Sequence, residues 1–233
     1  MKVGLHQPQY IPWPGYFAKI LYCDFFYYYD TAQYVKNSII NRNKVLINRG
    51  GSYLTIPVTK GRLAETIGEK RVVDERWKEK HRKTIAANYA KHPNFSELKM
   101  LVDEALNTDS EYLCEYNISF IKAVCEYLNI KTIIKYSSDY DINKHYEPTK
   151  YIINIVKNEK GTEYVSGSGA LNYLDRELLK DNGIVLKCFN FISSPYSQKG
   201  KESFVPGLSI IDLVANLPIV TIREYLKSNW RPI

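Results

Sequence analysis

The sequence predicts an α/β protein with a mostly parallel, doubly wound sheet and a helical insertion. Strand-like and helical runs alternate through the last third of the chain, which is typical of parallel sheets. Residues 2–29 form a strand–loop–helix–strand unit, and residues 74–128 carry three helical patterns in succession. The 233 residues fit a single domain, in which 74–128 is an insertion or subdomain.

The N-terminal elements are predicted from prolines, aromatic runs and glycines. Prolines end the first strand and delay the first helix, and an aromatic strand that ends at Asp30 follows that helix. Two strand-like runs flank Arg49-Gly50-Gly51, which is the pattern of a β-hairpin with a glycine turn. In chain order the expected elements are strand 2–6, helix 16–22, strand 25–29, polar loop 31–43, strands 43–48 and 52–58, and polar loop 59–72.

The remaining elements are predicted from helical periodicity and from residues that begin or end helices. Apolar and aromatic residues recur every four positions between Trp77 and Tyr89. Pro148 lies near one helix start, Asn182-Gly183 ends another helix, and Ser209 and Thr221 are expected N-caps. In chain order we expect helices 74–91, 95–107 and 110–128, strand 131–137, helix 149–157, strand 163–167, helix 170–180, strand 184–191, and helices 209–216 and 221–227.

Composition limits the partners and the compartment. The formal charge of +7 favours anionic partners, although a solvated basic surface explains the same excess equally well. The four cysteines form no CxxC pair, so we expect no metal site and a reduced, cytoplasmic protein. No signal peptide or membrane span is visible, and no aromatic RNA-binding signature points to nucleic acid.

The loop after the first strand is the first candidate site. It carries His6, Gln7, Tyr10, Trp13 and Tyr16 between three stiffening prolines. Ligands of open α/β sheets bind outside the carboxyl ends of the strands, where this loop begins. His6 offers a titratable group, and the other side chains offer hydrogen bonds and stacking surfaces. The alternative is a packed aromatic cluster under a rigid loop, with His6 satisfied in the core.

The second candidate group follows the aromatic strand. Asp30 shares a sheet edge with His6 if both strands are parallel, and it could orient a histidine or bind a hydroxyl. Arg42 could hold a carboxylate or phosphate through two hydrogen bonds. The alternative is a turn or cap role for Asp30 and a structural role for the others in the hairpin. The full group is Asp30, Gln33, Tyr34, Asn41, Arg42 and Asn43.

Two further groups lie later in the chain. His81 shares a helix face with Trp77, where a packed core histidine is the alternative to a binding role, and Lys80 beside it could meet an anion. A glycine-rich turn stands between a predicted strand and a predicted helix, whose start would attract anions. It lacks the Walker and GxGxxG patterns, and a tight turn is the alternative. This turn consists of Ser166, Gly167, Ser168 and Gly169, with Tyr173 shortly after it.

These motifs together resemble the WbqC-like family across nearly the whole chain. The resemblance is carried by HQPQYIPWPGYFAKI (6–20), the aromatic strand ending in Asp30, QY (33–34), NRN (41–43) and TIPV (55–58), and then by W-x-x-K-H-x-K-x-I-x-x-x-Y (77–89), LNI (128–130), YVSGSGALNYLD (164–175) and LSIIDLVAN (208–216). Members occur in bacterial surface-polysaccharide gene clusters. The resemblance therefore implies an enzyme that modifies an amino sugar or nucleotide-linked sugar for O-antigen or capsule, by acyl or aminoacyl transfer that forms an amide. A non-catalytic sugar-nucleotide-binding module is the alternative.

The order of elements is also similar to the HUP nucleotidyltransferase-like fold, a Rossmann-like arrangement. Some HUP enzymes activate a carboxylate with ATP, but this chain has one histidine in the first loop and no later lysine–serine signature, so ATP use stays open, as does a homodimer. In this interpretation His6 is a base or stabilises negative charge, Asp30 orients it, and Arg42 holds an anion. The turn at 166–169 cradles phosphate, and Tyr10, Trp13 and Tyr16 form the walls of a sugar pocket.

Overall fold

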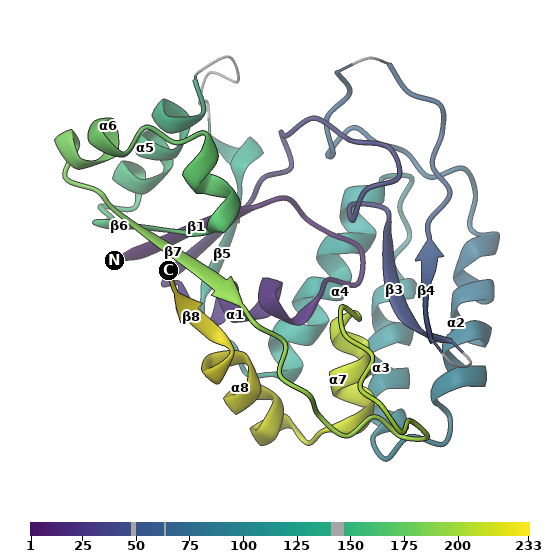
Figure 1. Cartoon of the computed structure of the whole chain (residues 1–233). Helices are drawn as coiled ribbons and strands as arrows, with labels where there is room; N and C mark the ends of the chain where they lie inside the picture. The colour runs from purple at the N-terminus through teal and green to yellow at the C-terminus, as the bar shows by residue number, and fades with distance from the viewer. Residues whose placement is uncertain (48–49, 63, 141–146) are drawn as a thin grey trace.

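A central six-stranded sheet confirms the predicted α/β class (Figure 1). The computed structural model describes residues 1–47, 50–62, 64–140 and 147–233. The first five strands of the sheet are parallel and the last is antiparallel. Their order across the sheet is β5 (Ile133–Tyr136), β2 (Phe25–Tyr28), β1 (Lys2–His6), β6 (Glu163–Gly167), β7 (Val185–Phe191) and β8 (Trp230–Pro232).

Helices cover both faces of this sheet, as a doubly wound fold requires. One face packs on α1 (Pro14–Tyr22), α4 (Leu113–Tyr127) and α8 (Ile219–Ser228), and the other on α5 (Pro148–Asn158) and α6 (Arg176–Asp181) (Figure 1). Successive side chains of a strand point to opposite faces. Phe26 accordingly lies in the first core, whereas Tyr27 lies in the second. Both faces are buried, which explains the nearly continuous apolar and aromatic character of β2.

A second layer stands beside the sheet and shares its first core. It contains the antiparallel pair β3 (Arg42–Ile47) and β4 (Gly50–Thr55), with α2 (Arg76–Tyr89), α3 (Phe95–Leu106) and α7 (Ile210–Asn216) (Figure 1). One apolar cluster runs from α1 through α4 to these elements. The assignment of 74–128 as an insertion stays a prediction. No helix in the described part of the chain is long and apolar enough to cross a membrane.

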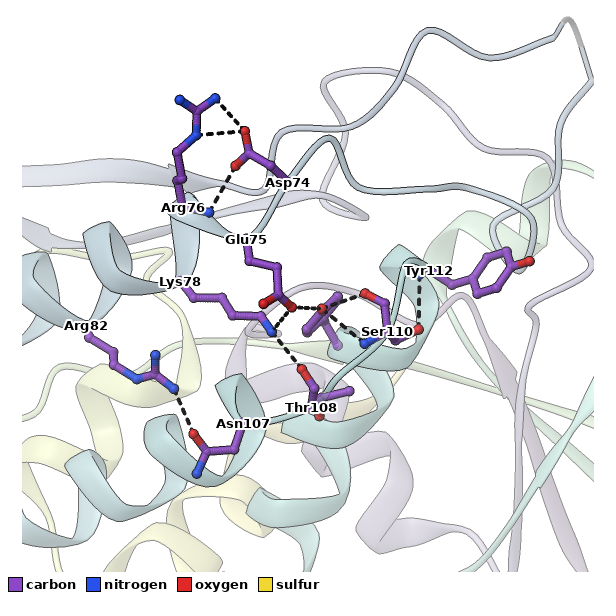
Figure 2. Close-up of polar contacts among 10 residues, drawn as sticks. Asp74, Glu75, Arg76, Lys78, Arg82, Asn107, Thr108, Ser110 and Tyr112 are labelled. Atoms are coloured by element: carbon purple, nitrogen blue, oxygen red, sulfur yellow. Dashed lines mark hydrogen bonds and ion pairs between the residues drawn. The ribbon is translucent and has the colours of Figure 1, made fainter.

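Polar contacts tie the start of α2 to the connection between α3 and α4 (Figure 2). Lys78 is buried, pairs with Glu75, and donates a hydrogen bond of 2.8 Å to the carbonyl oxygen of Thr108. One turn further along α2, Arg82 donates to Asn107 Oδ1 at 2.9 Å. These contacts bind the three helices into one unit, because a buried ammonium must keep its acceptors.

The structure corrects the boundaries of two predicted helices. The helix expected over 170–180 is broken into a short 3-10 helix, η2 (Ser168–Asn172), and α6. The cause is Asp175, whose side chain accepts from Leu178 N at 3.0 Å and so caps a new helix. The last helix begins after Pro218, which leaves Thr221 inside it, whereas Ser209 caps α7 as predicted.

In the hairpin, the glycines lie in a strand and not in the turn. Gly50 pairs with Ile47 and Gly51 with Leu46, as part of β4. The rest of the predicted turn, including Arg49, lies outside the described residues. Strand β8 was not expected from the sequence, because three residues are too few to show a period.

Candidate functional site

The main candidate site lies where the strand order of the sheet reverses. From β1 the chain continues to β2 and β5 on one side, and later to β6 and β7 on the other. In open α/β sheets, ligands bind at this reversal, outside the carboxyl ends of the strands. A cavity of about 330 Å³ opens there, which we call the switch-point pocket. His6 and Gln7 line it after β1, and Ser166, Gly167 and Gly169 line it from β6 onward.

The pocket opens because the two central strands separate at their carboxyl ends. β1 and β6 pair only as far as Gly4, which lies opposite Val165. Beyond this point β1 stays paired with β2 as far as His6, and β6 stays paired with β7 as far as Gly167. At their carboxyl ends, β1 therefore pairs only with β2, and β6 pairs only with β7. The last residues of both strands therefore turn backbone and side-chain groups toward a shared gap.

His6 presents a neutral imidazole to this gap. Its Nδ1 lies 3.2 Å from Gln9 Nε2 and 3.3 Å from the carbonyl oxygen of Gln7, and its ring packs edge-on against Tyr16 with centroids 5.1 Å apart. Burial, and to a smaller extent the charge of Lys19, lowers the pKa of His6 to about 3. A neutral Nδ1 either donates to Gln7 O or accepts from Gln9 Nε2, and in the tautomer that donates to Gln7 O the other ring nitrogen, Nε2, is left to accept from a ligand.

The turn after β6 contributes room and backbone groups, not a helix start. Ser166 is buried, whereas Ser168 is exposed and does not line the pocket. A Cβ at Gly167 would meet only the Phe189 carbonyl at 4.0 Å, and one at Gly169 would meet nothing within 4 Å. The fold therefore does not require glycine at either position. The space at these glycines is open to a ligand. The anion-attracting helix start predicted here is replaced by the short η2.

Tyrosines form the apolar side of the pocket. Tyr29 and Tyr151 stack with ring centroids 5.1 Å apart and an interplanar angle of 29°. Tyr164 lines the pocket from β6, and Tyr173 lines its rim with 56% of its surface exposed. Burial raises the pKa of Tyr29, so this phenol stays neutral. Of the four, the sequence pointed only to Tyr173, since the others belong to ordinary strand and helix patterns.

Lys19 is a further lining residue that sequence reasoning missed. It lies on α1 with only 3% of its surface exposed, and its Nζ donates to the carbonyl oxygen of Leu5 at 2.8 Å. Burial lowers its pKa from 10.5 to about 8. A lysine inside the otherwise apolar run from Phe17 to Leu21 was the available signal.

The aromatic residues of the first loop do not line the pocket. Tyr10 is buried, and its hydroxyl lies 2.7 Å from His81 Nδ1. Burial lowers the pKa of His81 to about 4, which is expected of a packed core histidine. Trp13 packs edge-on against Phe191 at 5.5 Å, and Tyr16 is 2% exposed beneath His6. Tyr10, Trp13 and Tyr16, which were predicted to line a sugar pocket, therefore pack against the protein core and hold the loop in place.

Buried asparagines hold that loop in place. Asn43 Nδ2 donates to the Ile11 carbonyl oxygen at 3.1 Å, and Asn117 Nδ2 donates to that of Pro8 at 3.0 Å. Ile11 has a φ of 35°, which is unfavourable for a β-branched residue and persists only where the surroundings fix it. Asn41 instead donates to Ile56 O at 3.0 Å within the hairpin layer. The two predicted asparagines thus have structural partners.

Asp30 follows β2 by two residues, at the same edge of the sheet as His6, but its partners are elsewhere. Its Oδ1 accepts from Ser137 Oγ at 2.7 Å and from Ser138 N at 3.1 Å, in the 3-10 helix η1 (Ser137–Asp139). This is the turn role that the sequence left as the alternative. It fixes the end of β5 next to β2.

The other members of the second group lie outside the switch-point pocket. Arg42 packs over the Tyr53 ring at 4.7 Å. Lys70 lies over the Tyr34 ring at 5.0 Å, and Gln33 is exposed. The structure therefore brings His6 and Gln7 of the first group together with four members of the fourth, Ser166, Gly167, Gly169 and Tyr173. No residue of the second or third group lines this pocket, although His81 and Asn43 contact the first loop.

The fold and the pocket define an α/β protein with a ligand-sized cavity at the switch point of its sheet. The model of the WbqC-like protein family matches residues 7–224, so the chain belongs to this family. An uncharacterized protein of Mycobacterium tuberculosis, Rv1507c, is 32% identical over 218 residues, which cover 93% of this chain and 94% of that relative. No solved structure matches the chain.

Proposed function

We propose that the protein is an enzyme of bacterial surface-polysaccharide biosynthesis that acylates or aminoacylates an amino sugar, free or nucleotide-linked, to form an amide. Membership of the WbqC-like family supports the polysaccharide context. The observation that carries the proposal is the switch-point pocket, in which stacked tyrosines face polar groups from two strand ends. Tyrosine rings suit the apolar faces of sugars and bases, and their hydroxyls suit sugar hydroxyls.

The reaction needs an amine, an activated acyl group and an acceptor for one proton. The amine nitrogen attacks the acyl carbon, the C–N bond forms, and the donor's leaving group departs with its bonding electrons. His6 Nε2 is the group of the pocket that can accept the amine proton or hold the amine by a hydrogen bond. With a pKa near 3, His6 is a weak base, so the hydrogen-bonding role is the stronger one.

ATP fits this pocket poorly. The lining offers one lysine and, among the described residues that form it, no aspartate or glutamate to bring a magnesium ion to a triphosphate. Backbone and hydroxyl groups at the 166–169 turn suit one small anionic group better than three phosphates in a row. We therefore derive no step through ATP and favour a donor that arrives already activated, such as a thioester.

The test is a mass-spectrometric search for product. The protein is incubated with UDP-glucosamine and either acetyl or glycyl thioester, and in parallel with glycine and ATP. We expect a new amide with a thioester donor, and its loss in His6→Ala. The matched control is His92→Ala, because His92 lies three residues after α2 and contacts Asn216 Oδ1 at 2.9 Å, outside the pocket.

The weak basicity of His6 also favours a second candidate, a non-catalytic module that binds a nucleotide-linked sugar. This candidate predicts saturable binding of UDP-glucosamine. It also predicts that the mass of UDP-glucosamine stays unchanged with every acyl donor tested. If binding depends on Tyr151 while every donor fails, the binding module is correct and the enzymatic proposal is wrong.

A further inference from the structure

Lys19 carries a buried charge without a protein counter-charge. Its side chain is 3% exposed, and no aspartate or glutamate is among the described residues that line the pocket around it. It contacts the carbonyl oxygen of Leu5 at 2.8 Å and the face of the Tyr164 ring at 6.0 Å. A buried ammonium is unfavourable unless it is paired, so the fold tolerates Lys19 at a cost in stability.

The position of Lys19 shows where a negatively charged group could reach its ammonium. The ladder between β1 and β6 ends at Gly4, and Leu5 is the first residue whose neighbour in β6 has moved away. The Lys19 side chain passes beside Gly4, whose Cβ would lie 3.5 Å from Lys19 Cε. It therefore reaches the gap between the separated strands from α1. An ammonium has three hydrogen-bond donors, and Leu5 O uses one of them.

We infer that Lys19 binds an oxyanion of the ligand, either a phosphate or a carboxylate, in the gap between β1 and β6. The inference rests on the proposed function only in taking the switch-point pocket as the ligand site. The two remaining N–H groups of the Lys19 ammonium donate hydrogen bonds to the oxyanion, and the backbone at Gly167 lies beside it. The stacked pair Tyr29 and Tyr151 then faces the sugar ring attached to it.

A structural role for Lys19 is the competing explanation, because its bond to Leu5 O could simply close the end of the sheet. The two explanations differ in what removal of the charge does. A structural tie predicts lower stability and an equal loss of affinity for charged and uncharged ligands. An oxyanion site predicts a selective loss of affinity for charged ligands.

The experiment compares three probes by isothermal titration calorimetry at pH 7. UDP-N-acetylglucosamine carries phosphate, galacturonic acid carries carboxylate, and N-acetylglucosamine carries neither. The proteins are wild type, Lys19→Met, Lys19→Arg, and the matched control Lys187→Met, which removes an exposed lysine of β7. Each variant is first checked by circular dichroism and thermal melting.

We expect wild type and Lys187→Met to bind one anionic probe at least tenfold more tightly than N-acetylglucosamine. Lys19→Met should lose that preference and keep its affinity for N-acetylglucosamine within twofold, and Lys19→Arg should keep part of the preference. Which anionic probe binds distinguishes phosphate from carboxylate. A preference that survives in Lys19→Met overturns the inference, and so does failure of wild type to bind either anionic probe.

The outcome is separate from that of the enzymatic proposal. If Lys19 binds the anionic probe but no donor gives a product, the inference stands and the enzyme proposal fails. If Lys19→Met turns over an anionic substrate with unchanged KM, the inference fails and the enzyme proposal stands.

Discussion

Replacement of Lys19 by Met should make the protein more stable while it impairs ligand binding. Burial lowers the pKa of Lys19 from 10.5 to about 8, which corresponds to about 3 kcal/mol of unfavourable free energy for the charged form at neutral pH. Met has nearly the same length and removes this charge, at the loss of one hydrogen bond to Leu5 O worth about 1 kcal/mol. The expected net gain is about 2 kcal/mol in the free energy of unfolding.

The pH dependence of that gain follows from the two pKa values. Between pH 8 and 10.5 the unfolded chain binds more protons at Lys19 than the native chain does, so the stability of wild type rises with pH relative to the Met variant. The gain from Met is therefore largest below pH 8 and disappears by about pH 10.5. The titratable groups facing Lys19 are His6, Tyr164, Cys23 and Cys188. Burial lowers the pKa of His6 and raises the pKa values of the other three, so all four are neutral at pH 7.

The assay is urea unfolding followed by tryptophan fluorescence at pH 7 and pH 10, with thermal melting alongside. For a chain of this size, about 2 kcal/mol corresponds to a rise in Tm of about 4–8 °C. Lys187→Met serves as the control and should change the free energy of unfolding by less than about 0.5 kcal/mol at either pH. A Lys19→Met protein that is less stable than wild type at pH 7, by an amount that does not vary with pH, would refute the reasoning.

Three further predictions concern the pocket and its supports. His6→Gln should reduce acid sensitivity, because a native pKa near 3 makes wild type lose stability as the pH falls below 6.5; urea unfolding at pH 7 and pH 4.5 measures this. Asn117→Leu should cost about 2–3 kcal/mol, since two buried carbonyl oxygens lose their donor. The control Asn88→Leu, at a half-buried residue of α2 that donates to Thr84 O at 2.7 Å, should cost less in the same melts. Gly4→Ala should destabilise by about 1–3 kcal/mol, because its Cβ would lie 2.7 Å from Cys23 Sγ, and Gly169→Ala, which meets nothing, is its control in denaturant titration.

The first and last candidate groups could be found from the sequence because each stands at the end of a strand. The runs 2–6 and 163–167 are recognisable as strands, and the residues after them must emerge at the carboxyl edge of a parallel sheet. His6 and Ser166 thus share a pocket although 160 positions separate them along the chain. The family motifs, which span almost the whole chain, were equally visible in the sequence.

The walls of the pocket could not be found in this way. Tyr29, Tyr151 and Tyr164 come from a strand end, a helix and a strand, and each fits a simple core pattern in its own segment. Conversely, Tyr10 and Trp13 look like ligand contacts, yet they pack against His81 and Phe191. Local sequence gives the chemistry of a side chain but not the direction in which a loop turns it.

Hydrophobic periodicity, prolines and caps determined the strands, most of the helices and the edge of the sheet at which a ligand would bind, because these depend on neighbours within a few residues. Only the tertiary structure decided that β1 and β6 separate after Gly4 and that Lys19 reaches into the gap between them. It also decided that the Asp30 side chain accepts a hydrogen bond from Ser137 in η1 and that Arg42 lies in β3, outside the pocket. Such placements depend on contacts between segments distant in the chain, which no local pattern encodes.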